Sequence, residues 1–368
     1  MQIFILGMHR SGTSLLTRLL NLMGVYLGPE GSLLLPAEDN VKGFWERVEI
    51  LEMHEAILER MGMSWYRVAG FNPQVLDAES ERIFSIKVPQ FCYNIDSHRP
   101  WALKDPRLCL FFSRWKPYLE VPLCIFMYRR PLQVARSLAK RNGFPISFGL
   151  ALWEYYNIMA VCSMTDCPNM MVYFDDLMRR PVATGRKIFA KLKEFGVQRI
   201  NFPSTSEIKG FISPSLIHHK TEEVEEEAYV TCRQQAIFKF LRERETLDSF
   251  PYKISPHAQE IINEYHAKED TGKKFDRQRE ALNSALAEKA LLEEREEHFK
   301  SEKAALGELN TDLIRERNEL KREIVENQEE IAGLLRNLEN LRNQLEIKNM
   351  HMFKMRSEIW YSRKEQDK

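Results

Sequence analysis

The hydrophobic pattern of the first twenty residues predicts a buried strand, a tight loop and an amphipathic helix. Residues 3–6 are a short apolar run of the length expected for a strand inside a parallel sheet. Polar residues 9–14 follow, and then four leucines with a helical period at 15, 16, 19 and 20. Gly12 lets backbone N–H groups converge in the loop. Because these N–H groups and the helix dipole face one point, the pattern predicts a phosphate site.

A second apolar run covers residues 121–128, and a helical pattern follows it. Arg129 stands at the end of this predicted strand, and Ser137 comes eight residues later, about two helical turns on. We expect the two side chains to meet at one anion, because a guanidinium and a hydroxyl together suit a phosphate dianion. Ordinary surface charge at a strand end is the alternative explanation for Arg129.

The remaining apolar segments up to residue 221 alternate between predicted helices and predicted strands. Helices are predicted over residues 46–61, 147–163 and 182–196, and a strand over 170–174. The segment Trp101–Lys104 is an apolar approach to the polar run Lys-Asp-Pro-Arg at 104–107. We expect Asp105 to cap the helix that follows, with Pro106 in its first turn.

The loop motif excludes one class of nucleotide enzyme and suggests another. It reads Gly7-x-x-x-x-Gly12-Thr13-Ser14, so Thr13 stands where nucleoside triphosphatases have the lysine that reaches the β- and γ-phosphates. The cation is Arg10, before the turn. In this respect the loop resembles that of the sulfotransferase family, which holds the 5′-phosphosulfate of 3′-phosphoadenosine 5′-phosphosulfate (PAPS). The spacing of Arg129 and Ser137 resembles the family's grip on the 3′-phosphate.

This resemblance implies a P-loop-like α/β domain with a central parallel sheet and helices on both faces. It also implies that PAPS is the co-substrate and that no metal is required. Arg10 would stabilise charge on the leaving phosphate, with that phosphate held by Ser11, Gly12, Thr13 and Ser14. Arg129 and Ser137 would hold the 3′-phosphate.

Sulfuryl transfer to a hydroxyl also needs a proton acceptor. Residues 37–46 resemble a segment of bacterial sulfotransferases that ends in glutamate, and Glu46 is therefore our candidate base. A place in the first turn of a helix would explain Glu46 equally well. The rivals are Glu30, Glu38, Asp39, Glu49 and His54.

Three further cations are candidate contacts to the cofactor or acceptor. Lys104 and Arg107 flank an Asp-Pro pair, and the four residues resemble a Lys-Asp-Pro-Arg motif of bacterial sulfotransferase-like proteins. A surface ion pair of little energetic value is the alternative for both. Lys220, with His218 and His219, resembles the family's basic closing segment, although adjacent histidines are more often simply exposed.

Charge and cysteine usage narrow the class of protein. The net charge is zero overall, but residues 1–221 carry +7 and the remainder −7. This suits an anionic cofactor better than nucleic acid, since no basic run with interleaved aromatic residues is present. The six cysteines form no CxxC pair, several lie in apolar runs, and no leader or bilayer-length apolar stretch occurs. We expect a cytoplasmic protein with no transmembrane segment.

The C-terminal third has a different pattern. Residues 222–281 are predicted as a helical linker region, after a domain that covers residues 1–221. Apolar residues then follow a heptad repeat over 282–359, most regularly after residue 320. Isoleucine at a and leucine at d favour a parallel coiled coil, and hence a homodimer. A long solvated helix is the alternative.

The function predicted from the sequence is transfer of a sulfuryl group from PAPS to an acceptor hydroxyl or amine. Residues 355–360 loosely resemble segments that follow coiled coils in bacterial polysaccharide glycosyltransferases, which favours a carbohydrate acceptor. Two rivals remain. One is a non-catalytic scaffold with a degenerate sulfotransferase fold. The other is a P-loop kinase, disfavoured by Thr13 at the lysine position.

Overall fold

The computed structural model describes residues 1–29, 31–34, 43–212 and 229–305, and most of residues 320–352. Contacts divide the chain into two units, Met1–Lys268 and Glu269–Lys368. Within the described residues, no helix combines the length and the apolar character needed to cross a bilayer.

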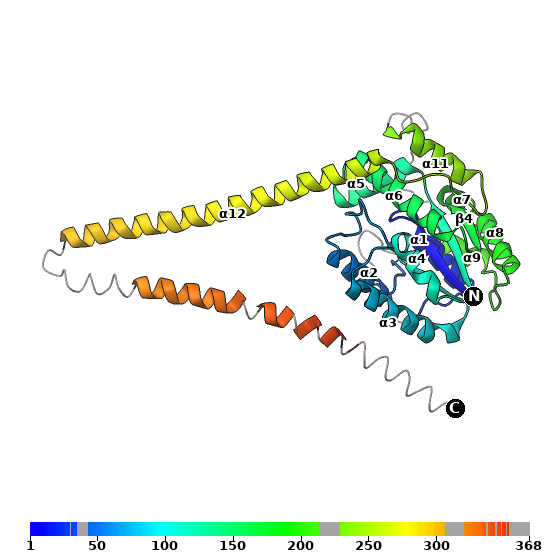
Figure 1. The fold of residues 1–368 in the computed structure, drawn as a ribbon, viewed down its shortest axis with the longest axis horizontal. Coiled ribbons are helices and arrows are strands. Elements are labelled where there is room, and N and C mark those ends of the chain that lie inside the picture. The colour runs from blue at the N-terminus through cyan, green and yellow to red at the C-terminus, as the bar shows by residue number, and fades with distance from the viewer. Residues whose placement is uncertain are drawn as a thin grey trace, which may run out of the picture. The chain divides into compact units, whose positions relative to one another are not determined.

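A four-stranded parallel sheet forms the centre of the first unit (Figure 1). Its strands lie in the order β2-β1-β3-β4, so that β1 is an inner strand and the chain crosses over between neighbours. The strands are β1 (Gln2–Leu6), β2 (Trp101–Lys104), β3 (Pro122–Tyr128) and β4 (Asn169–Tyr173). The parallel α/β architecture implied by the sequence is confirmed.

Alternate side chains of each strand enter two separate hydrophobic cores. In β1, Phe4 and Leu6 face one core, whereas Ile3 and Ile5 face the other, and all four are fully buried. Both faces of the sheet are therefore covered, which explains why the strands are mainly apolar.

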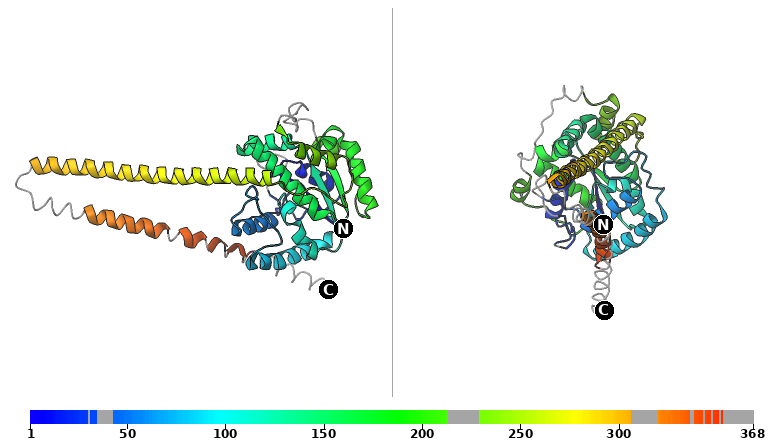
Figure 2. Two further views of the ribbon diagram at one scale, coloured as in Figure 1. Left: turned by 45° about the horizontal axis from the view of Figure 1, so that its top comes forward. Right: turned by 90° about the vertical axis from the view of Figure 1, so that its left-hand side faces the viewer.

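Helices on one face of the sheet share a core with Ile3 and Ile5 (Figure 2). They are α1 (Thr13–Leu22), α7 (Phe174–Arg179), α8 (Pro181–Glu194) and α9 (Thr205–Phe211). The opposite core is built with α2 (Val48–Arg60), α3 (Ala78–Ile95), α4 (Leu108–Trp115), α5 (Pro131–Asn142), α6 (Ile146–Met164) and α11 (Cys232–Arg242). Short 3₁₀ turns cover Asp96–His98 and Lys116–Tyr118.

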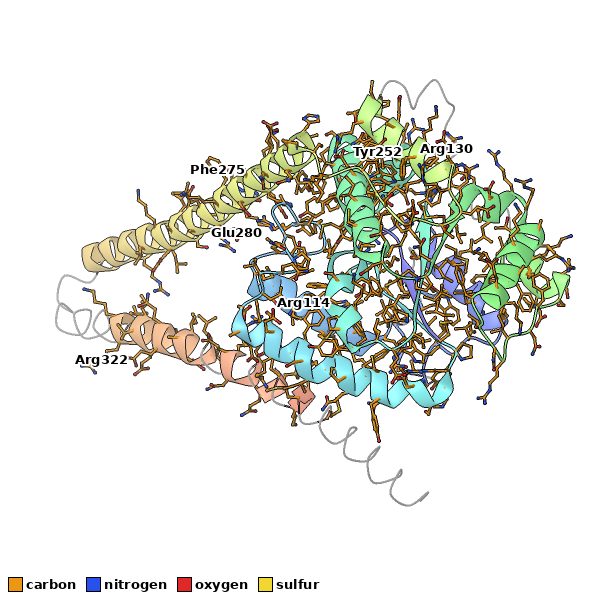
Figure 3. All side chains as sticks on the ribbon, turned by 45° about the vertical axis from the view of Figure 1, so that its right-hand side comes forward. Arg114, Arg130, Tyr252, Phe275, Glu280 and Arg322 are labelled. Carbon is orange, nitrogen blue, oxygen red and sulfur yellow. The ribbon has the colours of Figure 1, made fainter. Side chains whose placement is uncertain are left out.

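The long helix α12 (Pro256–Ala305) begins in the first unit, where Ala258 and Ile262 are buried in the same core as α11. Part of the segment predicted as a linker, residues 229–268, thus belongs to the first unit. Farther along, Phe275 is 66% exposed and projects from the helix with Glu280 (Figure 3). A long C-terminal helical region is confirmed, and its pairing as a coiled coil stays a prediction.

Candidate active site

The loop between β1 and α1 lies at the carboxyl edge of the sheet, where ligands of open α/β folds bind. Two glycines shape it. A Cβ atom on Gly7 would lie 2.4 Å from the carbonyl oxygen of Met127, and a Cβ on Gly12 would lie 2.4 Å from the ring of Phe174. Gly12 also has a φ of 92°, in the left-handed region that favours glycine. The loop is thus held tightly against β3 and α7.

Within this loop, Ser11 is fully buried and its hydroxyl has no hydrogen-bond partner among the described residues. A buried polar group without a partner is costly, which suggests that a ligand completes it. Thr13 is also buried, at the first position of α1. Arg10 adopts a φ of 67°, a conformation uncommon outside glycine and typical of functional loops. These residues fit a phosphate.

Arg10 contacts both members of the second predicted motif. Its Nε donates to Ser137 Oγ at 2.9 Å, while its carbonyl oxygen accepts from Arg129 Nη1 at 3.3 Å. Arg129 also donates from Nε to Gln133 Oε1 at 2.8 Å, and its guanidinium lies 4.1 Å from the centre of the Phe174 ring. The loop, the end of β3 and α5 thereby bring the predicted phosphate ligands into one cluster.

The cluster is strongly basic and shielded from solvent. Arg129 and Ser137 are each 7% exposed. Burial and the nearby charge of Arg10 lower the pKa of Arg129 to about 10, although Asp175 acts in the opposite direction. Arg129 therefore remains charged at neutral pH. An anion such as a nucleotide phosphate would stabilise these two neighbouring positive charges, of which Arg129 is buried and Arg10 is half-buried.

On the other side of the loop, the ammonium group of Lys104 at the end of β2 lies 2.5 Å from Glu46 Oε1. It also donates to Ser14 Oγ at 3.2 Å and to the carbonyl oxygen of Phe44 at 3.0 Å. Burial raises the pKa of Glu46, and Lys104 opposes this effect. Glu46 precedes α2, so the alternative that placed it in a helix's first turn is wrong.

Arg107 and Asp105 lie deeper, in a buried network. Asp105 accepts from His54 Nδ1 at 2.6 Å and from Arg107 Nη1 at 2.9 Å, and Arg107 also pairs with Glu55. Burial alone would raise the pKa of Asp105, but Arg107 and His54 hold it well below its usual range. His54 Nε2 accepts from Trp115 at 3.0 Å. Both His54 nitrogens are therefore used, and His54 is not a free base.

The predicted cap of α4 is corrected by this network. The helix begins at Leu108, with Arg107 at the capping position and no side-chain cap bond. Asp105 instead accepts from the backbone N–H of Arg107 at 3.1 Å and uses its other oxygen for His54. Because the Asp105 carboxylate binds His54 and Arg107, it stabilises the turn before α4 and does not cap the helix itself.

His9 was not singled out by the sequence patterns. Its ring centre lies 4.4 Å from that of Trp65 and 5.8 Å from that of Tyr156. The Nε2 atom is buried and has no partner in the described part of the chain. The residues next to His9 in the sequence could not have indicated its aromatic neighbours, because Trp65 follows α2 and Tyr156 lies on α6.

The sequence matches a model of the sulfotransferase family over residues 2–194, more than half of the chain and both phosphate motifs. The chain belongs to the sulfotransferase family. No curated protein matches the sequence.

The chain is also similar to solved structures of low identity. One is a sulfotransferase domain from the curacin biosynthetic pathway, with 16% identity and a TM-score of 0.32 over 72% of this chain and 96% of that one. A second, from the Synechococcus PCC 7002 olefin synthase, has 16% identity and a TM-score of 0.37 over 72% and 94%. Sulfotransferase STF9 from Mycobacterium avium has 15% identity and a TM-score of 0.34 over 68% and 78%. The family assignment therefore depends on the sequence match.

Several predicted residues of the sulfotransferase have no described placement. Among the rival bases, Glu49 pairs with Arg47 at 2.6 Å. Six predicted residues lie outside the described part of the chain: Glu30, Glu38, Asp39, His218, His219 and Lys220.

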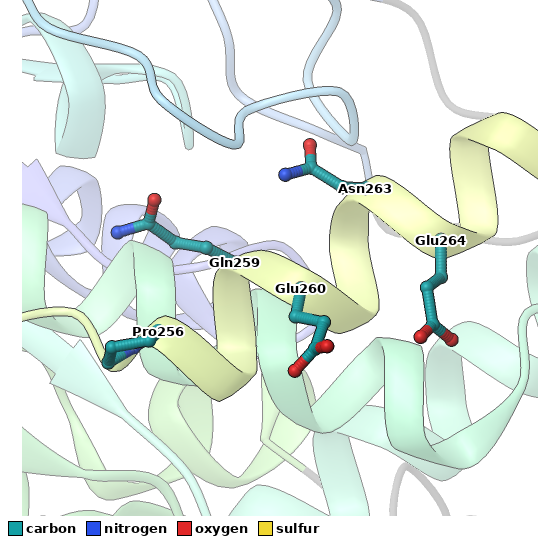
Figure 4. A pocket seen from close by; sticks show the side chains of 5 residues that line it. All are labelled: Pro256, Gln259, Glu260, Asn263 and Glu264. Carbon is teal, nitrogen blue, oxygen red and sulfur yellow. The ribbon is translucent and has the colours of Figure 1, made fainter.

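A pocket elsewhere in the sulfotransferase lies along the first turns of α12 (Figure 4). Its lining consists of Pro256, Gln259, Glu260, Asn263 and Glu264. Apart from Pro256 these side chains are polar or acidic, and none of the five belongs to the phosphate motifs. We therefore do not include this pocket in the candidate site.

Proposed function

We propose that this sulfotransferase moves a sulfuryl group from PAPS to a hydroxyl or amine of an acceptor. The observation that carries the proposal is the buried, unpartnered hydroxyl of Ser11 in the loop after β1. A phosphate oxygen would supply its missing partner. Arg10, next in the loop, supplies positive charge for an anionic donor.

The proposed roles follow the two phosphate motifs, the loop after β1 and the pair Arg129 and Ser137. Arg10 stabilises the charge that develops on the leaving phosphate oxygen, and the loop holds that phosphate through Ser11, Gly12, Thr13 and Ser14. Arg129 and Ser137 hold the 3′-phosphate. When bound, PAPS supplies an activated sulfuryl group, and the transfer as proposed uses no metal.

Lys104 belongs to the same proposal, because its ammonium group contacts Ser14 of the loop at 3.2 Å. Glu46 fixes that ammonium group by its ion pair. A role of Glu46 as the proton acceptor stays a prediction, and His9 is a second candidate for this role.

We further propose a carbohydrate acceptor, a cytoplasmic location and a homodimer. The acceptor class rests on the resemblance of residues 355–360, which lie outside the described part of the chain. The dimer is supported by exposed apolar side chains at heptad spacing in the second unit. These are Ile331, Leu334, Leu338, Leu341, Leu345 and Met352, each more than half exposed.

Calorimetric titration with 3′-phosphoadenosine 5′-phosphate (PAP), the product of the donor, tests the proposal. We expect PAP to bind far more tightly than ATP or ADP. Arg129→Ala should weaken PAP binding by about 1.5–3 kcal/mol, because a charged hydrogen bond is lost. Arg186→Ala, which removes an exposed arginine of α8, is the matched control and should leave the affinity unchanged.

Each outcome separates the candidate functions. If no nucleotide binds, the non-catalytic scaffold becomes the better explanation of the fold. If ATP binds and PAP does not, the kinase alternative is favoured. Equal affinity of the wild type and Arg129→Ala would remove Arg129 from the 3′-phosphate site.

A further inference from the structure

His9 is the residue immediately before Arg10, and its ring is held between aromatic side chains from two other segments. Trp65 comes from the connection after α2, and Tyr156 comes from α6. The hydroxyl of Tyr156 donates to the carbonyl oxygen of Trp65 at 2.6 Å, which fixes these two walls to each other. The imidazole is therefore positioned beside the phosphate loop by packing rather than by hydrogen bonds.

His9 is half-buried, and the hydrogen bonding of its Nε2 nitrogen distinguishes it from the fully buried His54 near the loop. His54 uses Nδ1 for Asp105 and Nε2 for Trp115. His9 Nε2 is buried and has no partner among the described residues. A buried nitrogen without a partner is unfavourable in the protein alone, and this suggests that a ligand group completes it.

Glu46, the candidate base from the sequence, is in the opposite situation. Its Oε1 lies 2.5 Å from the ammonium group of Lys104, and both side chains are less than 10% exposed. Taking a proton would neutralise Glu46 and leave the buried Lys104 charge uncompensated, which is costly. Proton transfer to His9 Nε2 breaks no ion pair, because that nitrogen has no partner among the described residues.

We propose that His9 Nε2 accepts the proton of the acceptor hydroxyl or amine during sulfuryl transfer. The proposal rests on the proposed function. As the acceptor oxygen or nitrogen bonds to sulfur, the bond from sulfur to the 5′-phosphate oxygen breaks and that oxygen keeps the electron pair. The acceptor proton moves to His9, and the resulting imidazolium later releases it to solvent. Glu46 then acts as a positioning residue for Lys104.

The charges around His9 suit this role. Burial lowers the pKa of His9 well below its ordinary value, and Arg107, Arg141 and Lys104 lower it further, while Asp105 acts in the opposite direction. The imidazole is therefore neutral at pH 7 and able to accept a proton. An anionic nucleotide beside Arg10 adds negative charge, which should raise this pKa toward neutrality and make His9 a stronger base.

The first test is an NMR titration of the His9 ring in the full-length chain, with and without PAP, using His9→Gln to assign the signal. We expect a neutral ring at pH 7 in the free protein and a higher pKa when PAP is bound. A ring that is charged at pH 7 without PAP, or a pKa that PAP leaves unchanged, would overturn the proposal.

The second test is chemical rescue, with PAPS as donor and water as acceptor, measured as release of inorganic sulfate. His9→Ala should retain PAP affinity within about twofold and lose about 10²- to 10⁴-fold in rate. Added imidazole should restore part of that rate. The matched variant Glu46→Ala should gain nothing from added imidazole.

The outcomes separate this inference from the proposed function. Equal rescue of Glu46→Ala by imidazole, or no rescue of His9→Ala by imidazole, overturns the role of His9 while PAP binding persists. If PAP does not bind at all, the proposed function itself fails. If the wild type binds PAP but releases no sulfate, the NMR titration alone decides about His9.

Discussion

Arg10 and Ser137 are 127 residues apart in the chain, yet Arg10 Nε donates to Ser137 Oγ at 2.9 Å. The contact joins the loop after β1 to α5. Arg129 completes it through the carbonyl oxygen of Arg10. A residue that we assign to the 5′-phosphate and two that we assign to the 3′-phosphate thus form one polar network, so the two halves of the nucleotide site are expected to be coupled.

Removing the serine hydroxyl tests this coupling. Ser137→Ala should weaken PAP binding by about 0.5–1.5 kcal/mol, less than Arg129→Ala, because the hydroxyl contributes a neutral hydrogen bond. Calorimetry measures the change. Ser163→Ala is the control, since among the described residues its hydroxyl donates to the carbonyl oxygen of Ala160 within α6, at 2.8 Å, and not to the candidate site. Equal PAP affinity of Ser137→Ala and the wild type would contradict the assignment.

The parts of the fold and site that the sequence predicted correctly depend on residues that are close together in the chain. A strand, a loop and a helix in direct succession define Gly7–Ser14, and eight residues fix Ser137 relative to Arg129. The strands at 121–128 and 170–174 and the helix at 147–163 match β3, β4 and α6 within one or two residues. Local order was enough because apolar runs between turn signals are short and unambiguous here.

The features that the sequence did not predict depend on contacts between distant segments. Asp105 looks like a helix cap until His54 and Arg107 are seen to occupy its carboxylate. His9 looks like an ordinary loop residue until Trp65 and Tyr156 enclose it. Arg107 is only two residues from Asp105, but His54, Trp65 and Tyr156 cannot be named as partners without the tertiary structure, because each is about fifty positions or more from the residue that it contacts.

The Lys104–Glu46 pair is expected to be strongly coupled in folding. Lys104→Met and Glu46→Gln should each lower the free energy of unfolding by about 3–5 kcal/mol, because each leaves its partner buried without compensation. The double variant should lose much less than the sum. Urea unfolding of all four proteins gives the interaction energy.

An exposed pair provides the control for this cycle. Lys191 and Glu194 are 2.7 Å apart on α8, with side chains 28% and 65% exposed. Their cycle should give an interaction energy of less than about 1 kcal/mol. Additive effects of Lys104→Met and Glu46→Gln would show that the buried pair does not act as a unit.

Gly12 is expected to be irreplaceable for reasons of space as well as backbone conformation. Gly12→Ala would place a Cβ atom 2.4 Å from the Phe174 ring in a residue with a φ of 92°. Gly143 has a φ of 70° and open space around its Cβ position, which makes Gly143→Ala a matched control for backbone strain alone.

We expect Gly143→Ala to cost about 1 kcal/mol of unfolding free energy and Gly12→Ala clearly more, since α7 must move away from the loop. Thermal and urea unfolding measure both. PAP binding should be lost only in Gly12→Ala. Similar stability of the two variants would mean that the contact with Phe174 yields easily.

The seam of the second unit gives the prediction about oligomeric state. Leu338 occupies a heptad a position and is 65% exposed, and Leu335, three residues before it, lies off the seam at 63% exposed. If a second copy covers the seam, Leu338→Asp places a charge inside the interface and should convert the dimer to a monomer. Leu335→Asp should remain dimeric, because Leu335 lies outside the seam. It is a matched control, since it changes the same residue type at nearly the same exposure. Sedimentation equilibrium of the full-length chain measures both masses, and a monomeric wild type at micromolar concentration would refute the coiled-coil dimer.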